Sequence, residues 1–173
     1  MQVMILCSAI CGLNIASSYK TYGTKQAHLN SDAFLSLVGS LAAIGGNAAG
    51  RFFWGSMSDK YGFKKCFMTL TCIQATTMLL YRHLAAHRLT FTLGTVLMLF
   101  CMGGNFAMFP AQTFRMFGAI GPNVYSFLFT GFGFAALLGP VVSNALLVKG
   151  GYALAFNVLA ALSLISLALA SLL

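Results

Sequence analysis

The sequence has very few charged residues, and almost none of them are acidic. Charged side chains make up 7% of the 173 residues, and the only acids are Asp32 and Asp59. A soluble domain carries about 25% charged residues, so this chain lacks the polar groups that would cover it in water. The composition therefore excludes a soluble enzyme, a disordered tail and a secreted disulfide scaffold.

Patterns typical of metal, catalytic and nucleic-acid sites are also missing. The five cysteines lie in or beside apolar runs without a C-x-x-C pair, which indicates small buried hydrophobes. No Ser/His/Asp set, zinc-ligand set or carboxylate pair falls within the apolar runs, so we expect neither an enzyme nor a cofactor. The net charge of +8 comes from Lys and Arg scattered between apolar runs, a distribution that does not favour nucleic acid.

Long apolar runs dominate what remains. A helix needs roughly 20 mainly apolar residues to cross the hydrocarbon of a bilayer. We predict an all-α, multi-pass integral membrane protein in which residues 1–173 form one domain of six transmembrane helices. The spans are about 1–19, 33–54, 66–81, 89–114, 124–148 and 152–173. A cleaved signal peptide is the alternative for the first run, although no Lys or Arg precedes it.

Polar residues inside these runs show which helix faces avoid lipid. In the second run Ser36, Ser40, Asn47 and Arg51 follow at steps of four, seven and four, which places them on one face of a regular helix. Similar polar stripes in the first, fourth and fifth runs predict a polar cavity between these four segments. The alternative for each stripe is helix-to-helix hydrogen bonding, worth about 0.6 kcal/mol per contact.

Arg51 is the most informative of these polar residues. A charge at the bilayer centre costs about 2.5–3.5 kcal/mol, so Arg51 either snorkels to the interface or serves a function. Its rigid guanidinium fork matches a carboxylate in a bidentate way that lysine does not. We therefore predict a substrate site made of Arg51, Asn47, Ser40, Asn14, Asn105, Gln112, Thr130 and Tyr125.

The connection after the second run carries a recognisable motif. Residues 55–65 read GSMSDKYGFKK, which resembles the loop motif G-x-x-x-D-[RK]-x-G-x-[RK]-[RK] of the major facilitator superfamily, with Phe63 departing from the usual basic residue. The resemblance implies a cytoplasmic loop. It also implies a conformational-gate role for Gly55, Asp59, Lys60, Gly62, Lys64 and Lys65. We expect Asp59 to meet the helix start near Pro122 and Asn123, where free N–H groups favour an anion.

The wider chain resembles the oxalate/formate antiporter and monocarboxylate transporter branch of that superfamily. The similar stretches are residues 18–23, 34–39, 50–55, 105–110 and 128–133, in the order of the family's C-terminal half. The resemblance implies that Arg51 binds the substrate carboxylate. It also implies that the chain is helices seven to twelve of a twelve-helix transporter. Its partner would then be a missing N-terminal six-helix half or a second copy.

Two departures from this branch bear on the substrate. Residues 124–148 contain no Lys or Arg, whereas the oxalate exchanger has a lysine in that helix, so a monocarboxylate is the better match. Asn47 stands where proton-coupled carriers have an aspartate.

We therefore expect a secondary transporter of small organic anions that works by alternating access in a lipid bilayer, with the kind of membrane and the mode of coupling left open. The alternatives are a transport-incompetent half that acts as an interaction or regulatory protein, a six-helix channel and a membrane enzyme.

Overall fold

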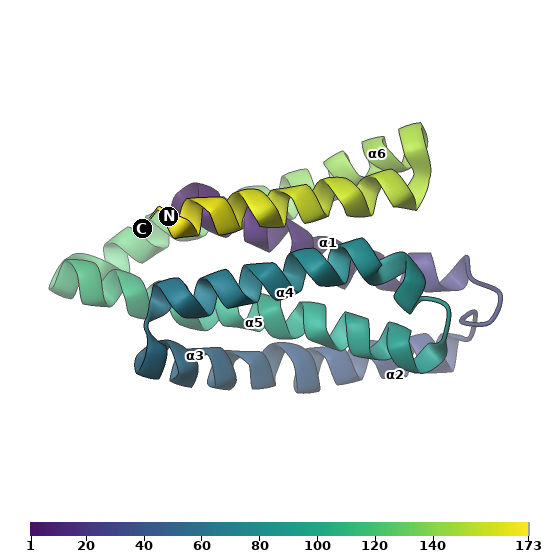
Figure 1. Cartoon of the computed structure of the whole chain (residues 1–173), viewed down its shortest axis with the longest axis horizontal. Helices are drawn as coiled ribbons and strands as arrows, with labels where there is room; N and C mark the ends of the chain where they lie inside the picture. Colours follow the sequence, from purple (N-terminus) through teal and green to yellow (C-terminus); the bar gives the residue numbers. More distant parts are fainter. Residues whose placement is uncertain (173) are drawn as a thin grey trace.

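The computed structural model of the chain describes residues 1–172, and these contain helices and no strands (Figure 1). The elements are α1 (Gln2–Thr24), α2 (Asp32–Leu41), the π-helical η1 (Ala42–Ala48), α3 (Ala49–Tyr61), α4 (Phe63–Leu84), α5 (Arg88–Phe117), the 3₁₀ turn η2 (Gly118–Ile120) and α6 (Gly121–Ser171). The prediction of an all-α chain is confirmed. Leu173, the last residue of the predicted span 152–173, lies outside the described residues.

Glycines set two of the breaks between helices. Gly62, with φ of +85°, separates α3 from α4, and Gly151, with φ of +66°, divides α6 into two helices. Both angles lie in the region that favours glycine over residues with a Cβ. Figure 1 shows the second part of α6 folding back beside the first. Because α2, η1 and α3 run on as one long helix, the described chain forms six helical rods.

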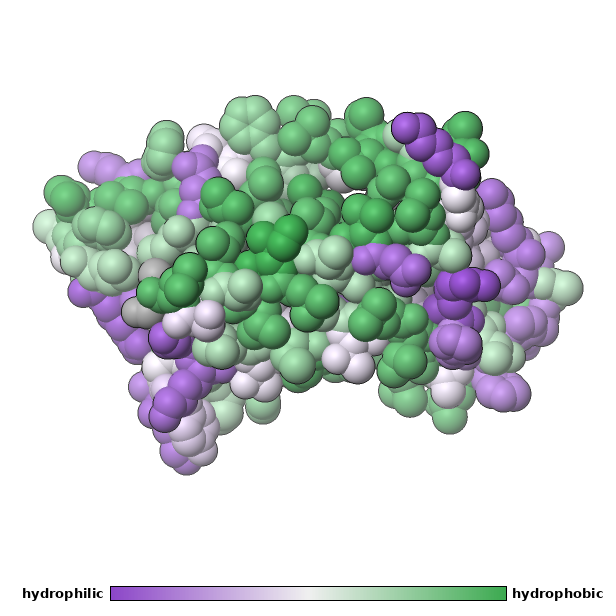
Figure 2. All heavy atoms as spheres, turned by 45° about the horizontal axis from the view of Figure 1, so that its top comes forward, coloured by the Kyte–Doolittle hydropathy of each residue, from purple (hydrophilic) through white to green (hydrophobic). Residues whose placement is uncertain are grey.

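Three helical stretches of the described chain are long and apolar enough to cross a membrane. They are Gln2–Thr24, Asp32–Tyr61 and Arg88–Ser171, the last of which includes α5 and both parts of α6. Helix α4 is outside this group; basic residues at its two ends, threonines and Gln74 all lower its hydropathy. Figure 2 shows hydrophobic residues over most of the middle of one face and hydrophilic residues toward its two ends. This is the surface of an integral membrane protein.

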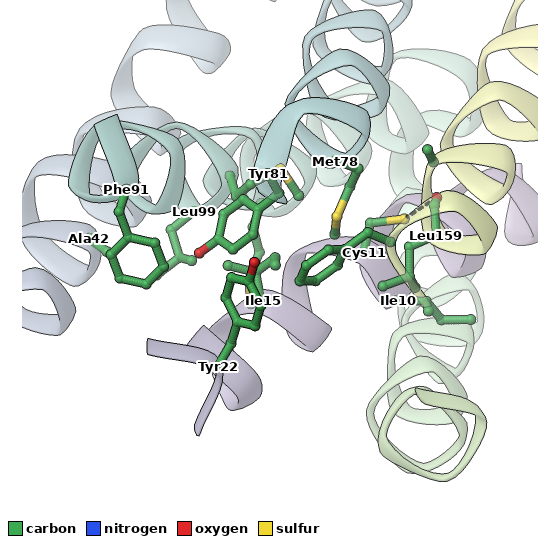
Figure 3. Close-up of a cluster of buried hydrophobic side chains, with 14 of the residues drawn as sticks. Ile10, Cys11, Ile15, Tyr22, Ala42, Met78, Tyr81, Phe91, Leu99 and Leu159 are labelled. Carbon is green, nitrogen blue, oxygen red and sulfur yellow. Dashed lines mark hydrogen bonds between the residues drawn. The ribbon is translucent and has the colours of Figure 1, made fainter. Parts of the chain in front are cut away.

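The main apolar cluster joins α1, α4, α5 and α6 (Figure 3). Tyr22 of α1 and Tyr81 of α4 each place their ring about 5.2 Å from the ring of Phe156 in α6. The Tyr81 hydroxyl lies 2.7 Å from the Thr95 hydroxyl of α5. The Cys11 thiol donates to the Leu159 carbonyl at 3.0 Å. Cys11 therefore acts as a small buried hydrophobe with a weak donor. The prediction of buried cysteines is confirmed for four of the five and is wrong for Cys72, which is exposed.

A buried polar cluster ties α1, α4 and α5 together. Ser8 Oγ donates to Gln74 Oε1 at 2.9 Å and accepts from Asn105 Nδ2 at 2.9 Å. Gln74 Nε2 also donates to the Ser8 carbonyl at 2.8 Å. All three side chains are at most 1% exposed. In this part of the chain the polar stripes thus serve helix-to-helix bonding, and Asn105 does not face a cavity.

This cluster gives a stability prediction for Ser8. Ser8→Ala leaves Gln74 Oε1 and Asn105 Nδ2 buried with one partner fewer each, so it is expected to lower the free energy of unfolding by about 1–2 kcal/mol. Thermal unfolding in detergent measures the change. Ser17→Ala is the matched control, because the Ser17 hydroxyl is bonded only to the Asn14 carbonyl of its own helix. Equal effects of the two substitutions would contradict a special role for the cluster.

Helix α5 lies unusually close to η1 and α3. A Cβ added to Gly46 would lie 2.7 Å from the Val96 carbonyl oxygen. A Cβ on Gly50 would strike the Phe100 carbonyl, and one on Gly103 would strike the Asn47 carbonyl. Glycines on both helices therefore permit this close contact, as small residues do in membrane proteins. The contact fixes the backbone on which Arg51 stands.

Candidate functional site

Arg51 lies in α3, just after the π-helical turn η1. Its Nε donates to Asn47 Oδ1 at 3.1 Å, and its guanidinium carbon lies 4.6 Å from the centre of the Phe106 ring in α5. The second contact joins the side chain to α5, whereas Asn47 lies four residues earlier in the same long helix. The neighbouring π turn fits this picture, because such turns are frequent at functional sites.

Aromatic rings extend this surface from α5 to α6. The Phe106 ring lies 4.6 Å from Phe132 and 6.2 Å from Phe129, and Tyr125 lies 5.6 Å from Phe129. Phe129 is 40% exposed, so the surface is open in this chain. We call Asn47, Arg51, Phe106, Tyr125 and Phe129 the arginine face. It combines the guanidinium of Arg51, the side-chain amide of Asn47 and three aromatic rings.

No acidic side chain neutralises the Arg51 charge. Asp32 pairs with Lys20 at 2.9 Å, and Asp59 pairs with Arg115 at 2.6 Å, which uses both acids of the sequence. Within residues 1–172 neither terminal nitrogen of Arg51 makes a hydrogen bond. The two Nη groups of the guanidinium fork are therefore free to bind an external anion.

The structure brings only part of the predicted site together. Asn47 and Tyr125 belong to the arginine face. Asn105 is committed to Ser8, and Thr130 Oγ1 accepts from Gln2 at 3.1 Å. The Ser40 hydroxyl donates to the Ser36 carbonyl of its own helix.

Asn14 and Gln112 line other cavities. Asn14 faces a small polar cavity of about 190 Å³ between α1 and α6, together with Ser143 and Asn144. Gln112 lies beside Lys64 and Lys65 at the end of the bundle near the α3–α4 turn. Neither of these two cavities is lined by Arg51. The eight residues of the predicted site therefore do not lie together in this structure.

The π turn explains why Ser36 and Ser40 separate from Asn47 and Arg51. The prediction assumed a regular helix from residue 36 to residue 51. A π turn closes at i→i+5 and so adds about one residue to a turn, which rotates the helix before it by roughly 100° relative to the helix after it. Pattern reading at 3.6 residues per turn has no signal for this insertion. It also missed Phe106 and Phe129, because aromatic residues are expected on any membrane-facing helix.

The loop motif lies at the end of the molecule where α3 meets α4. Gly62 is the residue with positive φ that this turn requires. Asp59 does not meet the start of α6 near Pro122 and Asn123. Its carboxylate is held by Arg115 in the last turn of α5, which also donates to the Ser58 carbonyl at 3.3 Å. Asp59 is thus paired with a charged side chain of α5, and not with the N–H groups of a helix start as expected.

Comparisons with known proteins bear on the whole chain. The family model described as Major Facilitator Superfamily matches residues 3–173. Over 107 residues, 60% of this chain and 19% of the relative, the chain is 36% identical to "Apicoplast pyruvate carrier 1" of Toxoplasma gondii. Over 127 residues, 72% of this chain and 30% of the relative, it is 31% identical to "Oxalate:formate antiporter" of Oxalobacter formigenes. The matched parts thus span about a fifth to a third of these curated relatives.

Proposed function

The chain belongs to the Major Facilitator Superfamily, and from that membership we propose that it is a six-helix half of a secondary transporter for small monocarboxylates. Alternating access of the two halves around a central site would move the substrate. Relatives named as a pyruvate carrier and an oxalate:formate antiporter support an organic anion as the substrate class.

The observation that carries this proposal is the unneutralised Arg51 on the arginine face. A guanidinium with two free Nη groups binds a carboxylate through two parallel charge-assisted hydrogen bonds. Asn47 occupies Nε, and the Phe106 ring lies over the guanidinium, so the fork is oriented before a substrate arrives. Such preorganisation lowers the entropic cost of binding.

The charge of the arginine face favours one carboxylate over two. Arg51 is the cation of this surface, and residues 124–148 of the facing helix contain no Lys or Arg. A dicarboxylate would bring a second negative charge without a partner, and an unpaired charge is costly away from water. We therefore propose monocarboxylates such as 2-oxo acids rather than dicarboxylates.

We also propose that the arginine face is completed by a second six-helix half. The matched relatives are several times longer than the matched region, and Phe129 of the arginine face is 40% exposed in this chain. A second half, either N-terminal or a second copy, would close the face into a cavity. A half that never pairs in this way would act as an interaction protein, and we expect that chain to show no uptake in any combination.

Uptake in proteoliposomes tests the function. Vesicles that contain the chain with its completing half are expected to take up labelled pyruvate at least ten times faster than labelled oxalate. The reason is the single cation of the arginine face. Faster uptake of oxalate would contradict the monocarboxylate assignment, and absence of uptake of every anion would favour the interaction protein.

The same vesicles give a pH prediction. Asp32 and Asp59 lie outside the arginine face, and Asn47 does not titrate, so this half offers no acid beside the substrate. Between roughly pH 6 and 8 a small carboxylic acid stays ionised. Uptake is therefore expected to change less than about twofold over this range. A steep change that maps to a residue of this chain would contradict the prediction.

A further inference from the structure

Two adjoining cavities lie between α3, α4 and α5, away from Arg51. The first is an apolar groove of about 490 Å³, within the range of about 300–1,000 Å³ that accommodates whole ligands. Along α4 it runs from Lys65 to Ile73, about 12 Å at 1.5 Å per residue. Its walls are Phe53, Trp54, Met57, Tyr61, Lys65, Cys66, Thr69, Ile73 and Phe100. We call it the tail groove.

The second cavity carries two lysines. It measures about 340 Å³ and is lined by Tyr61, Gly62, Phe63, Lys64, Lys65, Gln112 and Met116. We call it the head pocket. Tyr61 and Lys65 line both cavities, so the head pocket opens beside the tail groove.

The lysines of the head pocket have no acidic partner within residues 1–172. The two ion pairs there join Lys20 to Asp32 and Arg115 to Asp59. Lys64 Nζ donates to the Ser171 carbonyl, at the end of α6, at 2.8 Å. The pocket therefore combines the ammonium groups of two lysines with the amide of Gln112, a set that suits a phosphate.

We propose that the head pocket and the tail groove together bind one anionic phospholipid. The phosphate would lie against Lys64 and Lys65, and one acyl chain would lie along the tail groove. The depth of each part fits a bilayer. Tyr61 ends α3 and the two lysines lie in the first turn of α4, at one end of the bundle, whereas Ile73 lies further along α4. Aromatic and basic residues favour the headgroup region, whereas an acyl chain needs hydrocarbon depth.

A free metabolite does not fit this pair of cavities as well. A soluble anion would use the head pocket and leave the tail groove empty, whereas a phospholipid matches both the charge of one and the apolar walls of the other. Burial of the CH₂ groups of an acyl chain adds to the affinity, and a soluble anion has no such contribution. The site is thus separate from the arginine face and does not depend on the proposed transport substrate.

Trp54 makes this proposal measurable, because it is the one tryptophan of the sequence and it lines the tail groove. Bromine on an acyl chain quenches tryptophan fluorescence only at short range. The chain is reconstituted in phosphatidylcholine vesicles with rising fractions of dibrominated phosphatidylglycerol or dibrominated phosphatidylcholine. Half-maximal quenching is expected at a fraction of brominated phosphatidylglycerol that is about a fifth, or less, of the fraction of brominated phosphatidylcholine required. The reason is that each lysine near the membrane surface raises the affinity for an anionic lipid roughly fivefold.

Three variants distinguish a specific lipid-binding site from the general attraction of anionic lipids to a basic protein surface. Lys65→Gln is expected to reduce the preference for phosphatidylglycerol about fivefold. Lys60→Gln, the matched control, is expected to leave it within about twofold, because Lys60 lines neither cavity. Thr69→Phe, which fills the tail groove, is expected to weaken quenching by both lipids while helicity by circular dichroism stays unchanged.

Each contrary outcome overturns the proposal. Equal quenching of the wild-type chain by both lipids would mean that Trp54 contacts only bulk lipid. Equal losses from Lys60→Gln and Lys65→Gln would mean diffuse surface charge rather than a pocket. Unchanged quenching in Thr69→Phe would mean that no acyl chain lies in the tail groove.

Discussion

Replacing Arg51 by lysine is expected to reduce pyruvate uptake at least tenfold in vesicles that contain the chain with its completing half. Lysine keeps the charge but loses the planar fork, so one of two charge-assisted hydrogen bonds to the carboxylate disappears. A hydrogen bond to a charged group is worth about 1.5–3 kcal/mol, which corresponds to a factor of ten or more. Initial uptake rates at equal protein density measure the effect.

Arg88→Lys is the matched control for this substitution. Arg88 also stacks on a phenylalanine, with its guanidinium carbon 5.2 Å from the Phe34 ring, and its Nε donates to the His28 carbonyl at 2.9 Å. It lies at the start of α5, at the opposite end of the bundle from the loop motif. Its replacement is expected to leave uptake within about twofold. If Arg51→Lys behaves like Arg88→Lys, Arg51 is a snorkelling residue of the interface.

Gly50→Ala is expected to lower the free energy of unfolding by about 1–3 kcal/mol, the usual cost of overpacking. The added Cβ would strike the Phe100 carbonyl of α5, and the Phe100 carbonyl carbon and Cα would lie only 3.0 Å away. Backbone atoms cannot move aside as a flexible side chain can. The strain would separate α3 from α5 and displace Arg51 from Phe106, so uptake should fall as well.

Gly45→Ala tests whether this loss comes from the close contact. Gly45 lies in the same long helix, but a Cβ there would have no atom within 4 Å. Alanine favours helix over glycine by up to about 1 kcal/mol, so this variant is expected to be neutral or slightly more stable. Thermal unfolding in detergent compares the two. A loss of stability in Gly45→Ala equal to that in Gly50→Ala would contradict the account of the α3–α5 contact.

Most of the fold can be predicted from the sequence because its signals are strong and local. The scarcity of charge requires a membrane, and apolar runs near 20 residues require helices within it. The loop motif predicts a connection between two helices, and the observed φ of +85° at Gly62 explains why glycine occupies that position. Helix α4 is the least obvious element, because its threonines and Gln74 weaken the apolar signal and are explained only by the contacts they make.

The site is harder to predict because it depends on rotation and on distant partners. Arg51 and Asn47 are found from spacing, since they lie four residues apart, at the end of η1 and the start of α3. Asn105 has the same polar character as Asn47, yet its amide bonds Ser8 of another helix, and no local pattern distinguishes the two cases. Likewise, Asp59 meets Arg115 only because α5 ends beside α3. The type of a polar side chain alone does not show whether it hydrogen-bonds a neighbouring helix or faces a ligand.

The proposed function depends on pairing between the Arg51 guanidinium and a substrate carboxylate. Calorimetric titration measures it most directly, with pyruvate and its neutral amide as ligands and the wild-type and Arg51→Gln proteins as receptors. The four dissociation constants give a coupling free energy between the guanidinium and the carboxylate. We predict a coupling of at least about 1.5 kcal/mol, with the wild type alone preferring the carboxylate strongly. The same preference for pyruvate over its amide in both proteins, and hence no coupling, would contradict the account.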